Sequence, residues 1–267
     1  MNLNQIRLAL NRQFRRFFYN HIYYSDWLSG DLHFFNLGVV PIDSAIVSTL
    51  PFPDEQHQAQ VYVEAIKAFR RHSSHPAPAR VLEVSTGLGG GLGVLAQCFP
   101  AAEIFGLDYA RVSIRRSRRT QASAVLIVAD AQAAPFNDRS FQLIVNVESF
   151  HALNALTFLS EARRMLTADG LLIIIDFRKA PVDRLQHWIN EQAEASGMTI
   201  VEFLDLTQNA IASARSDTPR RNRLLQRIPP PFKKLANEMT AGEGSELLKQ
   251  YMDGEKTYFL CVLKQSG

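Results

Sequence analysis

From residue 80 onward, the sequence alternates short apolar runs with segments whose apolar residues recur at helical spacing. This alternation is typical of a parallel β-sheet whose strands are joined by crossover helices. The apolar runs are continuous in Val, Leu and Ile, so we expect strands that are buried on both faces. Five strands are predicted at 80–85, 103–108, 124–130, 141–147 and 171–177, and three helices at 91–98, 111–120 and 155–167.

The sheet is expected to continue towards the C-terminus. Gly170 is predicted to end the helix at 155–167 in a left-handed conformation. Pro181 and Gly197 bound a further helix, and two more strands are expected at 198–207 and 257–265. About fifty residues separate those two strands, and an insertion of that length usually serves as a lid or binding element.

A linker rich in Ser and Pro at 70–80 indicates how the chain is organised. We expect residues 1–75 to form a helical cap, and residues 76–267 to form the core with a lid insertion at 208–256. Four apolar residues at helical spacing, Ile6, Leu10, Phe14 and Phe17, predict an amphipathic helix that packs on the core. The first 25 residues hold four arginines and no acid, which leaves targeting or membrane contact as the alternative for this helix.

Composition and charge exclude several classes of function. A net charge of +3, from 29 basic and 26 acidic residues, does not indicate a polyanionic partner. The arginines of the helix at 111–120 are interpreted as a solvated face, and no nucleic-acid partner is predicted. Cys98 and Cys261 lie in apolar runs without a C-x-x-C pattern, which argues against disulfides or zinc and fits a reducing cytoplasm. No apolar run reaches the roughly 18 residues that a membrane span needs.

The segment "LEVSTGLGGG" at 82–91 follows the first predicted strand, and five of the fourteen glycines lie between residues 87 and 93. A strand, a glycine-rich turn and a helix present backbone N–H groups to a polar ligand, and glycines let that ligand approach the main chain. The dinucleotide pattern G-x-G-x-x-G fails here because residue 92 is Leu. The turn therefore indicates a nucleotide-like ligand but not NAD.

Three acids lie in register with this turn. Glu83 lies in the first strand, Asp108 ends the second and Asp130 ends the third. A carboxylate at the second strand end can accept both hydroxyls of a ribose, and one at the third can accept an adenine amino group. Any one acid is equally well explained as a turn or N-cap residue, but the three together favour a nucleoside site.

Five motifs in series resemble those of class I S-adenosylmethionine (SAM)-dependent methyltransferases, over about residues 80–180: "VLEVSTGLGGG", "GLDYA", "VADAQAAPF", "FQLIVNVESFHAL" and "RRMLTADGLLIIIDFR". "EVSTGLGGG", "NVESFHA" and "DFR" are more narrowly similar to polyketide-tailoring O-methyltransferases, such as those acting on phthiotriolone lipids. The resemblance implies an α/β fold with a Rossmann-like seven-stranded sheet, mostly parallel with an antiparallel last strand. It also implies SAM as cofactor.

The resemblance assigns cofactor contacts to residues at the ends of the first four strands: Glu83, Ser85, Gly87, Gly89, Asp108, Tyr109, Asp130, Ala131 and Asn146. Two positions depart from the usual pattern. Most class I enzymes have glycine where this chain has Ser85, and Gln142 replaces an aspartate that is common at the start of the fourth strand.

Residues after the fourth strand are expected to face the sulfonium methyl, because ligands of this fold lie beyond the strands' carboxyl ends. His151 is the predicted general base for an acceptor hydroxyl. The alternative is that His151 is a partly buried loop histidine whose ring hydrogen-bonds to backbone groups. Glu148 is predicted to orient His151, to hold a substrate hydroxyl or to contact the cofactor. Glu148 and Asp176 could together bind magnesium, but two carboxylates on different strands are common without a metal, and no metal is predicted.

Many aromatic residues in the aminoterminal region, including Phe34 and Phe35, predict a pocket for a hydrophobic small-molecule acceptor, free or bound to a carrier protein. The predicted reaction is methyl transfer to a hydroxyl of a polyketide-like metabolite. Three alternatives stay open: carbon methylation, SAM-dependent cyclisation, and a non-catalytic SAM-binding module. A homodimer is also left open.

Overall fold

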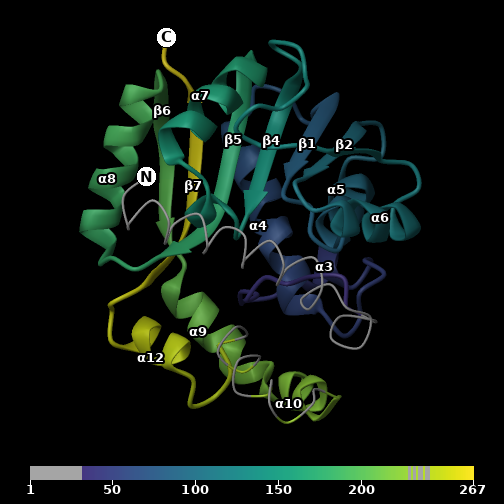
Figure 1. Cartoon of the computed structure of the whole chain (residues 1–267), viewed down its shortest axis with the longest axis vertical. Helices are drawn as coiled ribbons and strands as arrows, with labels where there is room; N and C mark the ends of the chain where they lie inside the picture. Colours follow the sequence, from purple (N-terminus) through teal and green to yellow (C-terminus); the bar gives the residue numbers. More distant parts are fainter. Residues whose placement is uncertain (1–31, 228–229, 231–232, 234–236, 238–240) are drawn as a thin grey trace, which may run out of the picture.

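The computed structural model describes residues 32–227, 230, 233, 237 and 241–267, with a seven-stranded sheet at its centre (Figure 1). The strands are β1 Arg80–Val84, β2 Glu103–Asp108, β3 Val125–Val128, β4 Phe141–Val147, β5 Leu166–Arg178, β6 Met198–Asp205 and β7 Thr257–Gln265. Their order is β3-β2-β1-β4-β5-β7-β6. β1 to β5 pair in parallel, and β7 runs antiparallel to both β5 and β6. The predicted sheet is confirmed, including its antiparallel last strand.

Helices cover both faces of the sheet. They are α3 Ser44–Val47, α4 Gln56–His72, α5 Gly90–Cys98, α6 Arg111–Thr120, η2 Phe150–Ala152, α7 Ala155–Met165, α8 Val182–Ala195, α9 Thr207–Ser216, α10 Thr218–Arg227 and α12 Glu246–Met252. In β4, Leu143 and Val145 join the core cluster beneath α4 and α5, whereas Ile144 joins the one beneath α7 and α8. The strand is buried on both faces, which explains why Leu143, Ile144 and Val145 are apolar in succession.

The chain between α7 and β5 differs from the prediction. Gly170 does not end α7 in a left-handed conformation, so that prediction was wrong. α7 ends at Met165, and Leu166 already has extended backbone angles as the first residue of β5. The register between β4 and β5 shifts between Phe141 and Leu143. A Cβ on Gly170 would lie 2.8 Å from the Phe141 carbonyl oxygen, so this close approach explains the glycine.

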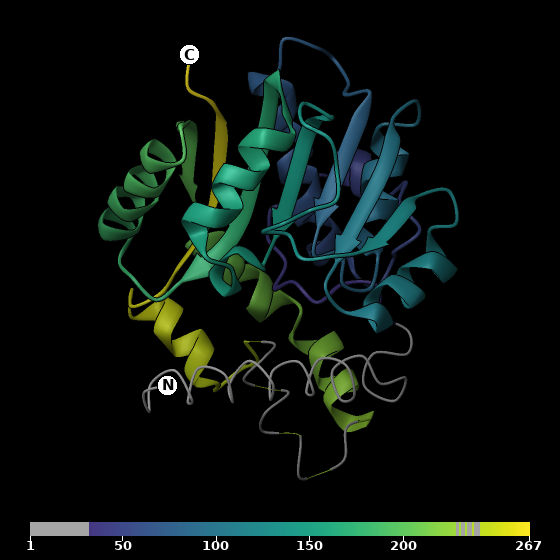
Figure 2. The ribbon, with the colours of Figure 1, turned by 45° about the horizontal axis from the view of Figure 1, so that its top comes forward.

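Three helices of the predicted insertion, α9, α10 and α12, lie beyond the carboxyl ends of the strands in both views (Figures 1 and 2). From the predicted cap, α4 buries Val61, Ile66 and Phe69 against the sheet. The predicted amphipathic helix at Ile6 to Phe17 falls outside the described residues. Among the helices that are described, none is long and apolar enough to cross a membrane. The division into cap, core and lid stays a prediction.

Gly91 is the glycine whose substitution should disturb the core most. A Cβ there would lie 2.1 Å from Glu83 Oε1 and 2.2 Å from a ring carbon of Tyr62. Gly91→Ala should lower the free energy of unfolding by about 2 kcal/mol, because overpacking of about 1–3 kcal/mol outweighs the helix propensity gained. Denaturant unfolding measures this difference.

Gly254→Ala is the control for that measurement. Gly254 has φ +72° and nothing within 4 Å of an added Cβ, so its cost should be about 1 kcal/mol, from the left-handed backbone alone. A Gly91→Ala protein more stable than the wild type would contradict the packing described here.

Candidate active site

The turn after β1 is built from left-handed residues. Ser85, Gly87 and Gly89 have φ values of 63°, 57° and 88°. The left-handed region costs a residue with a Cβ roughly 1–2 kcal/mol, which explains why glycine suits the Ser85 position. The Ser85 N–H donates to the Leu107 carbonyl at 2.7 Å, so pairing with the neighbouring strand end holds the serine in this conformation.

The five glycines of this turn differ in what surrounds them. An added Cβ would clash with the protein itself at four of them: Gly89 against Ser117, Gly90 against Phe34 and the His33 carbonyl, Gly91 against Tyr62 and Glu83, and Gly93 against Gln121 and Phe52. At Gly87 the nearest such atom is the Ser85 carbonyl oxygen, 4.0 Å away. Close approach of a ligand to the main chain is therefore available at Gly87, whereas the other glycines serve packing.

Asp108 ties β2 to the glycine turn. Its Oδ2 accepts from the Gly87 N–H at 3.0 Å and the Ser113 hydroxyl at 2.7 Å, and its Oδ1 accepts from the Ala110 N–H at 2.8 Å. Burial raises the pKa of Asp108, and these hydrogen bonds oppose that effect. A carboxylate has about four acceptor positions, so Asp108 keeps capacity for about one further donor rather than two.

Glu83 lies beneath α5, away from the open side of the turn. It is 1% exposed, and its Oε1 accepts from the Tyr62 hydroxyl at 2.6 Å. Its Oε2 is buried without a hydrogen-bond partner among the described residues. Burial raises the pKa of Glu83 to about 8. At neutral pH this side chain is mostly protonated.

The remaining predicted cofactor residues follow the ends of β2 and β3 or lie near the end of β4. Tyr109 is 57% exposed, and Asp130 is exposed with its Oδ1 accepting from the Gln132 N–H at 2.9 Å. Ala131 is buried. Asn146 is fully buried and donates to the Ser149 hydroxyl at 2.7 Å. All of these residues lie at the carboxyl edge of the sheet, the same edge as Gly87.

His151 and Asp176 form a close pair at this edge. His151 Nδ1 lies 2.8 Å from Asp176 Oδ1, and the His151 backbone N–H donates to Oδ2 at 2.7 Å. The ring stacks on Phe177 at 4.3 Å between centroids. No described residue hydrogen-bonds Nε2, and the His151 side chain is 31% exposed. Nε2 is therefore the nitrogen that a substrate can reach.

The charge of His151 is set by opposing effects. Burial disfavours the imidazolium, but the carboxylate of Asp176, with a smaller effect from Glu148, more than offsets it, so the pKa of His151 is raised. The sequence prediction considered Asp176 only as a metal ligand. Among the described residues, no group of three or more His, Cys, Asp or Glu side chains is arranged to hold a metal ion.

Glu148 is fixed by contacts other than His151. Its Oε1 accepts from the Leu37 N–H at 2.7 Å and from the Tyr258 hydroxyl at 2.8 Å. The residue has φ 48°, a strained value for a side chain with a Cβ. Burial raises the pKa of Glu148 to about 7. The hydrogen bonds that orient the His151 ring come from Asp176, not from Glu148.

This part of the chain matches a known family of domains. Residues 82–174 match a family model described as "Methyltransferase domain". The chain carries a methyltransferase domain. It is a SAM-dependent methyltransferase, and SAM is its cofactor.

Known relatives of this methyltransferase agree with that assignment. Over 223 residues it is 28% identical to phthiotriol/phenolphthiotriol dimycocerosates methyltransferase 1 of Mycobacterium ulcerans, covering 81% of this chain and 78% of that protein.

Two solved structures share the fold. One is the O-methyltransferase from a trans-AT PKS multienzyme of Brevibacillus brevis with S-adenosyl-L-homocysteine, at 17% identity and TM-score 0.63, covering 85% of this chain and 84% of that one. The other is a geranyl diphosphate C-methyltransferase from Streptomyces coelicolor A3(2), at 15% identity and TM-score 0.62, covering 93% and 95%.

The residues present fit a SAM molecule at this edge. Gly87 gives open access to the main chain, and Asp108 has an acceptor position left for a hydroxyl. Partners of the turn that the sequence did not reveal, such as Phe34, Tyr62 and Ser117, come from distant segments. The pairing of Asp176 with His151 could have been predicted from the sequence, because Asp176 lies near the end of the strand next to the one that His151 follows.

The buried Glu83 predicts how stability depends on pH. Its pKa of about 8 lies above the usual value of 4.5, so the folded state holds a proton that the unfolded state releases. The free energy of unfolding should therefore fall as pH rises from about 4.5 to about 8. Glu83→Gln should reduce this fall by about 2–4 kcal/mol, while its amide oxygen can still accept from Tyr62.

Unfolding in urea at pH 5 and pH 8 measures that change. Glu103→Gln is the control, since Glu103 lies on the same sheet with its side chain 69% exposed, and it should leave the slope as in the wild type. An unchanged slope in Glu83→Gln would show that Glu83 ionises normally.

Proposed function

We propose that this methyltransferase transfers the methyl group of SAM to a hydroxyl of a hydrophobic, polyketide- or lipid-like small molecule. The observation that carries the proposal is the His151–Asp176 pair, with one ring nitrogen held by a buried carboxylate and the other open. That arrangement orients a base to accept a hydroxyl proton at Nε2. The name of the mycobacterial relative supports a lipid-like acceptor.

For the cofactor, we propose that Gly87 and Ser85 lie along it, and that Asp108 accepts one hydroxyl of its ribose. Tyr109, Asp130 and Ala131 would then line the side of the adenine. Asn146, Gly89 and Glu83 would support the turn and the sulfonium end. When bound, SAM supplies an activated methyl group on a positively charged sulfur.

The chain's own residues have two tasks in this reaction. The acceptor oxygen must be aligned with the methyl group, and alignment alone can supply up to about 7–11 kcal/mol of the barrier. The proton of the acceptor hydroxyl passes to His151 Nε2 as the oxygen bonds to carbon. Asp176 keeps the other ring nitrogen protonated and stabilises the resulting imidazolium. Glu148 would shape the acceptor side of the site through Leu37 and Tyr258.

Removing the base tests this mechanism. His151→Gln should lower kcat by about 10²–10⁴-fold and leave the affinity for S-adenosylhomocysteine close to that of the wild type. Turnover of a long-chain hydroxy ester and calorimetric titration measure the two quantities. Equal loss of affinity and turnover would mean that His151 holds the cofactor instead.

The pH profile gives an independent test. A base works when neutral and the pKa of His151 is raised, so kcat should increase with pH through an inflection above about 6.5 and then level off. Asp176→Asn removes the charge that offsets burial, and the inflection should move to lower pH. An inflection that stays in place would contradict the pairing.

The position of the new methyl group decides between oxygen and carbon. With SAM labelled by ¹³C at the methyl, we expect a product whose methyl carbon resonates as a methyl ether. A carbon-bound methyl would overturn the proposal, and so would an isomerised product without added mass, as cyclisation would give.

A further inference from the structure

We propose that the acceptor pocket contains a second polar subsite, formed by Arg221 and Tyr251, that binds a carbonyl or carboxylate oxygen of the same acceptor. The proposal rests on the proposed function and adds to it a substrate class: acceptors with a second oxygen besides the hydroxyl that is methylated.

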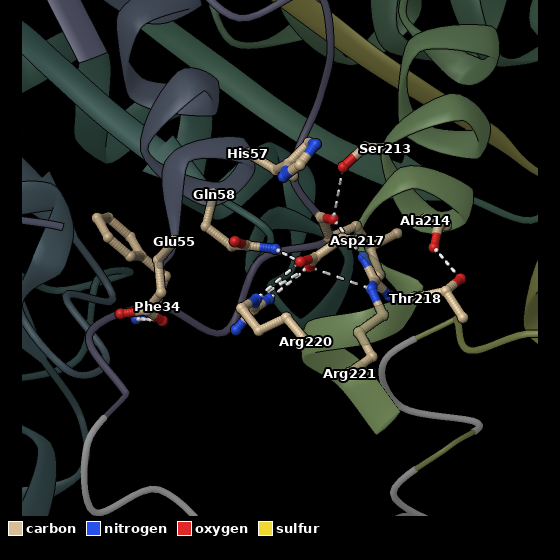
Figure 3. Close-up of polar contacts among 12 residues, drawn as sticks. Phe34, Glu55, His57, Gln58, Ser213, Ala214, Asp217, Thr218, Arg220 and Arg221 are labelled. Carbon is tan, nitrogen blue, oxygen red and sulfur yellow. Dashed lines mark hydrogen bonds and ion pairs between the residues drawn. The ribbon is translucent and has the colours of Figure 1, made fainter. Parts of the chain in front are cut away.

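Arg221 is a buried guanidinium with one unused nitrogen. The residue is 4% exposed, and it reaches from α10 to Asp217 and to the Leu37 carbonyl, to which its Nη2 donates at 2.7 Å (Figure 3). Its Nη1 is buried without a hydrogen-bond partner among the described residues. Leaving a buried charged donor unpaired is costly, so an enclosed acceptor atom is expected beside it.

Tyr251 supplies a second donor of the same kind. Its hydroxyl is buried on α12 and also has no hydrogen-bond partner among the described residues. Tyr258, from β7, makes a useful contrast, since its equally buried hydroxyl donates to Glu148 at 2.8 Å. Two unused donors from two lid helices therefore remain.

Contacts link both donors to Glu148 or His151, which places them on the acceptor side of the site. Lys256 Nζ lies 5.7 Å from the centroid of the Tyr251 ring and 4.5 Å from that of the Phe177 ring, which stacks on His151. Glu148 is also linked to Arg221 through one residue, because the Leu37 N–H donates to Glu148 and the Leu37 carbonyl accepts from Arg221. Asp176 in turn holds His151. The subsite and the base therefore belong to one neighbourhood.

The two unused donors favour an electron-rich ligand atom. Arg220 and Arg221 share the single carboxylate of Asp217, with N–O distances of 2.6 Å and 3.3 Å. Figure 3 shows both guanidinium groups converging on that carboxylate, together with Gln58. Glu148, which is linked to Arg221 through Leu37, is a second acid nearby. Arg221 Nη1 and the Tyr251 hydroxyl nevertheless lack an acceptor among the described residues. A carboxylate, an ionised enol or a polarised carbonyl would supply one, whereas a plain hydrocarbon would not.

The test uses two probes that differ only in the second oxygen group. The protein is loaded with S-adenosylhomocysteine and titrated with 3-hydroxydodecanoate or with undecan-2-ol, which is the same molecule with its carboxylate replaced by hydrogen. Wild-type protein should bind the hydroxy acid at least about tenfold more tightly. Tyr251→Phe and Arg221→Gln should each reduce that preference while retaining affinity for S-adenosylhomocysteine.

Matched variants separate recognition from folding. Arg220→Gln should keep the preference for the hydroxy acid. Arg220 also pairs with Asp217, but none of its nitrogens is among the described buried atoms that lack a hydrogen-bond partner. Tyr251→Phe should not lower the Tm, because its hydroxyl has no hydrogen-bond partner among the described residues, whereas Tyr258→Phe should lower it, because it removes the hydrogen bond to Glu148. If Arg221→Gln fails to fold, the binding preference of Tyr251→Phe still tests the proposal.

The proposal is overturned if wild type binds both probes equally, as it would if the two donors held only an enclosed water. It is also overturned if the preference survives in Tyr251→Phe. These outcomes are distinct from failure of the proposed function, which would appear as a carbon-bound methyl or no methyl transfer, whatever the binding preference.

Discussion

The buried carboxylate of Asp176 constrains the acceptor side of the site more than any other group. It is fully buried at the end of β5 and accepts from the His151 N–H, from the His151 ring and from the Phe177 N–H. An unpaired carboxylate in that position would be very unfavourable. The turn after β4 is therefore held where its backbone and ring meet the acid. The interaction that satisfies the buried charge also orients the nitrogen we assign as base.

The backbone of one residue, Leu37, connects three segments on the proposed acceptor side of the site. The Leu37 N–H reaches Glu148 at the end of β4, and the Leu37 carbonyl accepts from Arg221 on α10, with Ser213 of α9 at 3.4 Å. Three segments far apart in the sequence meet there. Because the contacts are made by main-chain atoms, the identity of the side chain at position 37 carries no signal of them. A displacement of α9 or α10 would act on Glu148 through this one residue.

The fold could be predicted because burial on both faces leaves a direct trace in the sequence. In β4 the successive residues Leu143, Ile144 and Val145 supply both cores, and the predicted strand at 141–147 coincides with it. Gly170 shows the limit of such reasoning. A glycine after a helix usually marks a left-handed end, but here it admits the Phe141 carbonyl of a neighbouring strand. Only the register of the sheet distinguishes these two causes.

The glycine turn shows the same limit within the site. Clustered glycines indicate that something lies close to the backbone, and the prediction took this to be the ligand. For Gly90 and Gly91 it is Phe34 and Tyr62, which the sequence places far upstream. Asp176, the partner of His151, could have been predicted from the sequence. β4 and β5 are adjacent parallel strands, so their carboxyl ends lie side by side. An acid at the end of one and a histidine after the other are neighbours by topology alone.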